Sequence, residues 1–276
     1  MEVIVLQSGS CGNCFFVSGG GTQILIDAGI SGRQAELRLA AHGYDIRGCS
    51  ALLITHDHCD HAKGLGVFHR KFGLPLHVTA RTLQQVRRWC DVGALAGPVH
   101  HFTAGESWTV GGLSIASIPT PHDGVEAVAF VISDGVHSVG ILTDLGHEFD
   151  GLRDVLRSLD AVVIESNYDD DMLHNGPYGP SLKRRIRGPG GHLSNREAAD
   201  LLRDPANRLQ WACLCHLSAE NNCPQLAMQT SREALGDAFP LYLAHRDRAT
   251  DILRLRERRD ASVERRERPE EVGSRQ

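Results

Sequence analysis

The sequence has no long hydrophobic run and no segment that resembles an export signal. No stretch approaches the roughly 18 apolar residues that a membrane-spanning helix needs. The first residues, Met1 to Leu6, read as a strand and lack a basic region followed by a long apolar core. We therefore expect a cytoplasmic protein that does not enter membranes.

An excess of positive charge is also missing. The chain has 29 Lys and Arg against 34 Asp and Glu, which gives a net charge of -5. This mild acidity is no global signature of nucleic-acid binding, so any such binding must rest on local basic segments. No cluster of aromatic residues that could stack bases is visible, so the composition does not separate a single strand from a duplex.

The 8 cysteines lack the setting of a disulfide framework, because the chain is too long for a disulfide-stabilised miniprotein and has no export signal. Cys11 and Cys14 match the C-x-x-C spacing of redox and zinc sites. That role needs a helix start after a strand, whereas Ser8-Gly9-Ser10 precede the pair and the strand-like Phe15-Phe16-Val17 follows it. We expect reduced thiols, with this pair in a loop between two strands.

With 276 residues and 41% hydrophobic residues, the chain is large enough for a full core in one large domain or two small ones. We expect a single catalytic domain over residues 1–250. Residues 251–276 are a dense mixture of Arg and Glu, which predicts a charged, disordered tail. The segment 174–191 is rich in Pro, Gly and basic residues, and we expect loops there.

The strongest motif is His56-Asp57-His58-Cys59-Asp60-His61, directly after the apolar run Leu52-Leu53-Ile54. His56 and His58 are two residues apart on extended backbone, so both can point to one side. Asp60 falls in the first turn of the next helix, where the helix dipole favours a carboxylate. This spacing predicts a metal site.

Other predicted strands also end in metal-capable side chains, as in an α/β scaffold that assembles one site from distant sequence. His122 follows Ile118, Asp144 follows Leu142, Glu165 follows Ile164 and His216 follows Cys215. The candidate metal ligands are His56, His58, Asp60, His61, His122, Asp144 and His216. Imidazoles and carboxylates suit Zn²⁺, Mn²⁺ or Fe. Two such ions about 3.5–4 Å apart, with Asp144 bridging, would hold a hydroxide for hydrolysis.

His-x-His-x-Asp-His is the hallmark of the metallo-β-lactamase superfamily, which the chain resembles. Further segments resemble the WalJ (YycJ) group: Gly9 to Cys14, Glu165-Ser166-Asn167, Asn175 to Tyr178, Gly191 to Asn195 and His216 to Asn222. The resemblance covers about residues 1–245. It implies an αββα sandwich, with two mixed sheets flanked by helices and a dinuclear metal site at one edge. It also implies a cytoplasmic phosphodiesterase, an exonuclease that acts on DNA rather than RNA.

The family's roles place His56, His58, His122 and Asp144 around the first metal ion. Asp60, His61, His216 and the shared Asp144 surround the second. Catalytic roles fall to Asp60 and, by analogy with tRNA-maturing endonucleases, to His192 oriented by Glu165. The alternative for His192 is an ordinary polar residue at a helix start.

Several weaker candidates complete this interpretation. Asn13, Lys183, Arg184, Arg185, Ser194 and Asn195 are candidate substrate contacts. The basic stretch also fits a solvated charged loop. Asp27 is either a solvated turn residue or a partner that orients a metal-bound imidazole. Cys11 and Tyr168 depart from the group, which usually has Ser and His there, and both departures could alter substrate contacts.

Two other functions remain open at this point. One is a thioester or lactone hydrolase of the glyoxalase II type on the same fold. The other is a non-catalytic binding module, which has no need of a complete ligand set. The basic stretch and the Gly-His-Leu-Ser-Asn element at 191–195 favour a phosphate substrate.

Overall fold

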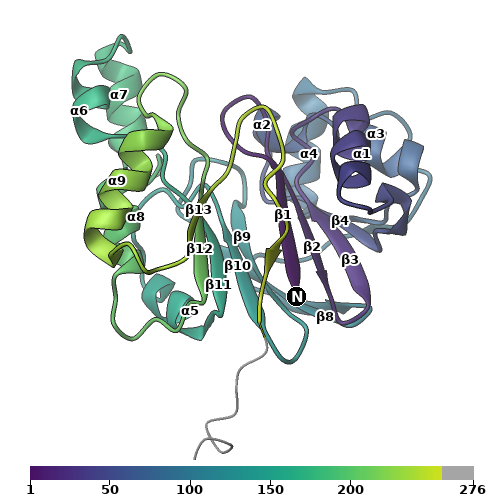
Figure 1. Ribbon diagram of the computed structural model, residues 1–276. Helices are drawn as coiled ribbons and strands as arrows, with labels where there is room; N and C mark the ends of the chain where they lie inside the picture. Colours follow the sequence, from purple (N-terminus) through teal and green to yellow (C-terminus); the bar gives the residue numbers. More distant parts are fainter. Residues whose placement is uncertain (257–276) are drawn as a thin grey trace, which may run out of the picture.

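Most strands of this protein carry apolar side chains on both faces, and both faces are covered. In the first strand, Val3 and Val5 belong to one buried cluster, while Ile4 and Leu6 belong to another. Strands of this kind require a layer of structure on each side of the sheet. The computed structural model describes residues 1–256 and shows that arrangement: two sheets packed face to face, with helices outside them (Figure 1).

Over residues 1–256, each sheet has seven strands and mixes parallel with antiparallel neighbours. The first sheet, in the order β14-β1-β2-β3-β4-β5-β6, contains β1 (Glu2–Gln7), β2 (Cys14–Gly19), β3 (Thr22–Ile26), β4 (Ala51–Leu53), β5 (Leu76–His77), β6 (Val99–His100) and β14 (Leu253–Arg254). The second, in the order β13-β12-β11-β10-β9-β8-β7, contains β7 (Ser107–Val110), β8 (Leu113–Pro119), β9 (Val128–Ser133), β10 (Ser138–Leu142), β11 (Ala161–Glu165), β12 (Trp211–Cys215) and β13 (Leu241–Leu243). Strands β3 to β6 run parallel, as do β10 to β13.

The helices divide between the two outer faces. The first sheet is covered by α1 (Gly32–Ala41), α2 (Cys59–Ala62), α3 (Leu65–Phe72) and α4 (Ala80–Trp89). The second is covered by α5 (Leu152–Ser158), α8 (Asn195–Leu202) and α9 (Pro224–Leu235). The short α6 (Asp170–Asn175) and α7 (Pro180–Arg187) project from one end of the sandwich (Figure 1). This is the αββα sandwich that the resemblance implied, so the fold prediction is confirmed.

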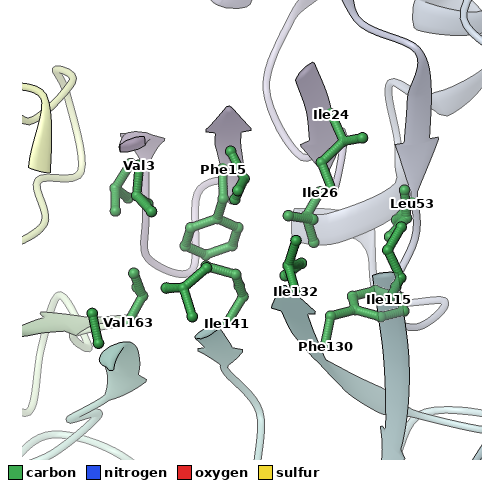
Figure 2. Close-up of a cluster of buried hydrophobic side chains, with 14 of the residues drawn as sticks. Val3, Phe15, Ile24, Ile26, Leu53, Ile115, Phe130, Ile132, Ile141 and Val163 are labelled. Carbon is green, nitrogen blue, oxygen red and sulfur yellow. The ribbon is translucent and has the colours of Figure 1, made fainter. Parts of the chain in front are cut away.

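The central core lies between the two sheets (Figure 2). Val3, Phe15 and Leu53 of the first sheet face Ile115 and Phe130 of the second, and all five are fully buried. Burying each of these side chains contributes roughly 1.5–3 kcal/mol. The core therefore holds the ends of strands from both sheets in fixed relation, which is what a site built across the two sheets requires.

Two predictions need correction. Residues 174–191 contain all of α7 and the end of α6, where we expected loops. The reason is that Pro180 opens α7 in its first turn, where its missing N–H and fixed φ favour a helix. The second correction concerns the domain boundary at residue 250, because β14 pairs with β1 beyond it and Leu255 is buried. The rest of the predicted tail, 257–276, lies outside the described residues.

Over residues 1–256, no helix combines the length and the apolar character needed to span a bilayer.

Candidate metal centre

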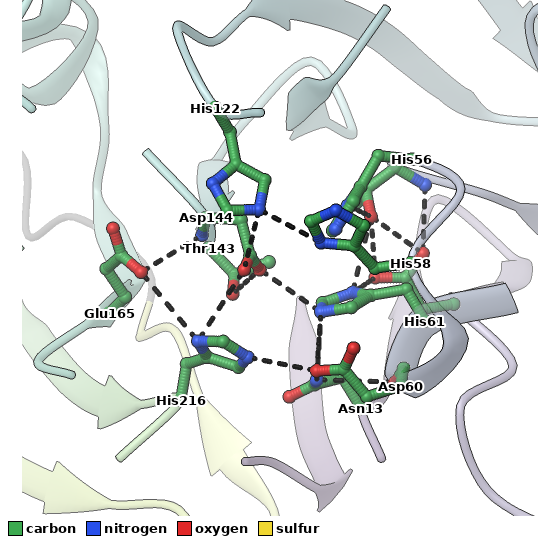
Figure 3. Close-up of polar contacts among 12 residues, drawn as sticks. Asn13, His56, His58, Asp60, His61, His122, Thr143, Asp144, Glu165 and His216 are labelled. Atoms are coloured by element: carbon green, nitrogen blue, oxygen red, sulfur yellow. Dashed lines mark hydrogen bonds and ion pairs between the residues drawn. The ribbon is translucent and has the colours of Figure 1, made fainter. Parts of the chain in front are cut away.

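The seven candidate ligands lie together at one edge of the sandwich, where strands of both sheets end (Figure 3). They fall into overlapping groups whose potential ligand atoms all lie within 4.8 Å of one another. Three such groups are His56, His58 and His122; His56, His61 and Asp144; and Asp60, His61 and His216. A fourth joins Asp144 and His216 to Glu165 and His192. The structure thus brings together every residue that the sequence proposed as a ligand.

The local chain geometry follows from the central motif. Strand β4 ends at Leu53, and five residues, with a bend at Asp57, lead to α2, whose N-cap is His58. Asp60 lies in the first turn of α2, as the spacing predicted. Asp57 points elsewhere: its carboxylate accepts a 2.6 Å hydrogen bond from the Val125 backbone N–H. The motif therefore also holds the loop that carries His122.

The first group consists of three imidazoles. The Nδ1 atom of His58 lies 3.2 Å from Nε2 of His122, and the ring of His56 lies within 5.0 Å of both, between centroids. Nε2 of His56 is buried and has no hydrogen-bond partner within the described residues. An unpartnered buried nitrogen is costly, and a metal ion at this point would satisfy it. The unpartnered Nε2 of His56 is therefore the structural evidence that a metal ion fits this site.

The second group adds carboxylates. Oδ2 of Asp60 lies 3.4 Å from Nε2 of His61 and 3.3 Å from Nε2 of His216. Asp144 lies between the two groups, with Oδ2 3.2 Å from Nε2 of His61 and Oδ1 3.6 Å from both Nε2 of His122 and Nδ1 of His216. Because it lies close to members of both groups, this carboxylate has the position of a bridge.

Four imidazoles have a fixed partner for the ring nitrogen that faces away from the cluster. These contacts are His61 Nδ1 to Asp27 Oδ2 at 2.7 Å, His56 Nδ1 to Thr55 Oγ1 at 2.9 Å, His122 Nδ1 to the Gly191 carbonyl at 2.9 Å, and His58 Nε2 to Asp123 Oδ1 at 3.3 Å. Such partners set the tautomer and orientation of metal-binding imidazoles. Asp27 is fully buried, so it is not the solvated turn residue of our first alternative.

Thr55 and Asp123 escaped the sequence analysis. Thr55 donates to both oxygens of Asp27 and contacts His56, so it joins two of these contacts. Both residues are immediate neighbours of predicted ligands in the chain. A polar residue adjacent to a predicted ligand was the available signal, but adjacency alone does not show which side chain turns inward.

Glu165 and His192 form a pair beside the ligand cluster. The carboxylate of Glu165 accepts backbone N–H bonds from Leu145 at 2.8 Å and Leu193 at 3.0 Å, and lies 3.1 Å from Nδ1 of His192. Burial would raise the pKa of Glu165, but its bonds with His192 and His216 lower it to about 2. Glu165 is therefore a fixed anion, and it leaves Nε2 of the half-buried His192 available for substrate.

The electrostatics of the cluster favour a cation. Burial would raise the pKa of Asp144, but the His216 and His61 imidazoles hold it well below its ordinary value. Burial would lower the pKa of His216, yet Asp144 and Asp60 raise it to about 10. Burial is likewise outweighed at His61, whose pKa rises well above its ordinary value beside Asp144 and Asp60. In the metal-free protein, protons on these two imidazoles balance the carboxylates.

This protonation predicts that metal binding releases protons. His61 and His216 must be neutral to bind a metal, so we expect about two protons to leave per protein near pH 8. Apparent affinity should rise with pH through the range in which these groups titrate. Titration calorimetry in two buffers of different ionisation enthalpy measures the proton count, and equal heats in both buffers would contradict it.

Three candidate substrate contacts are buried, and their side chains contact other residues of the protein. Asn13 is fully buried, with Nδ2 3.2 Å from Asp60 Oδ2 and 2.9 Å from His61 Nε2. Ser194 caps α8 in a capping box with Glu197, and Asn195 Oδ1 accepts a 2.6 Å hydrogen bond from Ser166 Oγ. We therefore no longer assign substrate contact to these residues. Asn13 belongs to the wall of the metal centre, and the other two fix the turn after His192.

The remaining substrate candidates differ in accessibility, and so do the two residues that are unusual for the WalJ group, Cys11 and Tyr168. Lys183, Arg184 and Arg185 lie on α7, and Arg185 lines a small cavity together with His122 and His192. Cys11 is exposed in the β1–β2 loop, between strands as predicted. Tyr168 is only 4% exposed, and its carbonyl accepts the Asn195 N–H at 2.8 Å. Tyr168 therefore belongs to the packed layer beneath the site.

Three site residues adopt a left-handed backbone conformation. The φ angles are 62° at Asp27, 56° at Asp144 and 53° at His216. Asp27 and His216 directly follow strands β3 and β12, and Asp144 is the second residue after β10. A side chain in this region costs roughly 1–2 kcal/mol, although Asp tolerates it better than most. The sharp turn aims each side chain into the cluster as soon as the strand ends.

Comparison with known proteins agrees with this geometry. The profile of the beta-lactamase superfamily domain matches residues 22–216. The exodeoxyribonuclease WalJ of Streptococcus pneumoniae is 34% identical over 257 residues, covering 90% of this chain and 96% of that protein. The exodeoxyribonuclease YycJ of Bacillus anthracis is 33% identical over 254 residues, covering 86% of this chain and 93% of that protein.

A solved structure shows the same fold at low identity. The metallo-β-lactamase fold protein YhfI of Bacillus subtilis superimposes with a TM-score of 0.69 at 17% identity, covering 91% of this chain and 99% of that one. The structural match confirms the architecture, and the sequence identity to WalJ and YycJ identifies the family within the superfamily. The chain belongs to the metallo-β-lactamase superfamily and, within it, to the WalJ/YycJ family.

Proposed function

We propose that this protein is a metal-dependent exodeoxyribonuclease. The observation that carries the proposal is the meeting of all seven candidate ligands at one edge, in a chain related to WalJ over 90% of its length. A hydrolase of this superfamily needs that cluster, and the exodeoxyribonuclease activity of the relatives WalJ and YycJ supplies the substrate class. The cytoplasmic location stays a prediction of the sequence.

The site would hold two divalent ions, Zn²⁺ or Mn²⁺ with Fe as an alternative. His56, His58 and His122 would hold one, and Asp60, His61 and His216 the other, with Asp144 shared. Bound there, such ions supply Lewis acidity and lower the pKa of water toward neutrality. A donor set of imidazoles and carboxylates suits each of these metals.

The protein's own groups would complete phosphodiester hydrolysis. Asp60 is partly accessible and close to His61 and His216, so its carboxylate would orient the attacking water. His192, held by Glu165 through Nδ1, would donate a proton from Nε2 to the leaving oxygen or hydrogen-bond the scissile phosphate. Burial of Glu165 keeps this imidazole in one orientation.

A thioester or lactone hydrolase of the glyoxalase II type is the less favoured alternative. The relatives that match over most of the chain are nucleases by name. Helix α7, whose Arg185 lines a small cavity with His122 and His192, also carries Lys183, Arg184 and Arg187. A dense group of cations suits a phosphate backbone and has no evident use for an uncharged acyl group.

The test compares substrates under the same metal conditions. End-labelled linear oligonucleotides should be shortened in Mn²⁺ or Zn²⁺, while circular single-stranded DNA should stay intact because it has no end. A glutathione thioester should be hydrolysed far more slowly. Cleavage of the thioester alone would refute the nuclease assignment, and cleavage of circular DNA would refute the restriction to ends.

A further inference from the structure

The cations of α7 have different partners, although they are neighbours in the sequence. Lys183 Nζ donates to the His174 carbonyl at 2.7 Å, and Arg187 donates to the Asp170 carbonyl at 2.9 Å. Both acceptors belong to α6. Positions 183 and 187 are four residues apart and share one face of the helix. These two side chains therefore fasten α7 to α6.

Arg185 points to the metal centre instead. Its Nε donates to Asp123 Oδ2 at 2.6 Å, while Oδ1 of the same carboxylate lies 3.3 Å from Nε2 of His58. The Arg185 side chain is 60% exposed. Within residues 1–256 its two terminal NH₂ groups make no hydrogen bond, so most of its donors remain available.

The backbone fixes Arg185 relative to the proposed proton donor. The carbonyl of Ile186, the next residue, accepts the His192 N–H at 3.0 Å. A Cβ at Gly191 would lie 2.0 Å from that carbonyl, so the close approach requires glycine. Arg185 and His192 also line the same cavity of about 30 Å³ beside His122, which is room for about one water molecule. Arg185 thus lies beside His192, the proposed proton donor.

We propose that Arg185 binds a phosphate of the nucleic-acid strand adjacent to the scissile bond, and that Asp123 holds it in place until substrate arrives. The inference rests on the proposed nuclease function. A guanidinium binds a phosphate through two parallel hydrogen bonds. An ion pair as exposed as Arg185–Asp123 is weak, so a phosphate can replace the carboxylate at small cost. Arg184 is not held beside the metal centre in this way, so it contributes only a non-specific electrostatic attraction to the nucleic acid.

The test uses Arg185→Ala, Arg185→Lys and the adjacent Arg184→Ala, which removes the same charge from the same helix. Binding is measured by fluorescence anisotropy with the metal-loaded protein and a hydrolysis-resistant phosphorothioate oligonucleotide. Arg185→Ala should raise Kd, and KM for a cleavable oligonucleotide, about tenfold or more, with a smaller effect on kcat. Lysine should restore part of the loss, and Arg184→Ala should raise Kd by a clearly smaller factor than Arg185→Ala, because it removes only general attraction.

A small diester separates the possible outcomes. Bis(p-nitrophenyl) phosphate has no neighbouring phosphate, so its turnover should fall much less than that of the oligonucleotide. Equal losses in the two alanine variants would overturn the proposal in favour of diffuse charge. Loss of metal in Arg185→Ala would overturn it in favour of a role through Asp123. If the unaltered protein cleaves the small diester but neither binds nor cleaves DNA, the proposed function itself fails, and this inference with it.

Discussion

Replacing Asp144 by alanine should release at least one metal ion and reduce hydrolysis to background. The reason is the position of its carboxylate, with one oxygen 3.2 Å from His61 and the other 3.6 Å from His122. No other carboxylate among residues 1–256 faces both groups in this way. Metal content by mass spectrometry and turnover of bis(p-nitrophenyl) phosphate provide the measurements.

Two further variants separate the carboxylate's role from the backbone's. Asp144→Asn keeps a residue that tolerates the 56° φ angle but removes the charge, and it should lose metal as alanine does. Asp150→Ala removes an exposed carboxylate from a nearby loop and should leave metal content as it is. Two ions fully retained in Asp144→Ala would exclude a bridging role.

His192→Ala should leave the metal content intact and reduce kcat by about 10²–10⁴-fold, the usual contribution of a positioned acid or base. His192 touches Glu165 at 3.1 Å and is half-buried, beside the proposed ligands but outside the set of seven. Kinetics on an end-labelled oligonucleotide, together with metal analysis, measure the two quantities separately.

His147→Ala is the matched control for this prediction. His147 is an exposed imidazole that contacts the Pro189 carbonyl, on the same side of the site. Its loss should leave both kcat and metal content near their original values. Should His192→Ala lose metal, His192 would be a ligand and its assignment as proton donor would be wrong.

The ligand set could be predicted because each ligand follows a recognisable apolar strand. His56, Asp144 and His216 come within three residues of β4, β10 and β12, and parallel strands bring their carboxyl ends to one edge. The positions of these ligands just after strands therefore predict most of the geometry of the metal centre. The same holds for the αββα architecture, since continuous apolar strands require cover on both faces.

Contacts between loops could not be predicted in this way. Asn13 and Asp60 are 47 residues apart, and Asp27 and His61 are 34 apart. Only the folded chain shows that Asn13 is buried against the ligands, or that Asp123 lies between Arg185 and His58. Helix α7 was missed because its flanking Pro and Gly resembled a loop, although Pro180 begins the helix.

The left-handed residues of the site offer a way to judge other sequences of this fold. Asp27, Asp144 and His216 hold a conformation that glycine or asparagine adopts at lower cost. A copy that no longer needs metal would gain stability by exchanging them, because selection would no longer oppose the cheaper residue. Glycine at these three positions in a relative should therefore mark lost activity. Retained Asp, Asp and His should mark an enzyme still under selection, even where the rest of the sequence has diverged.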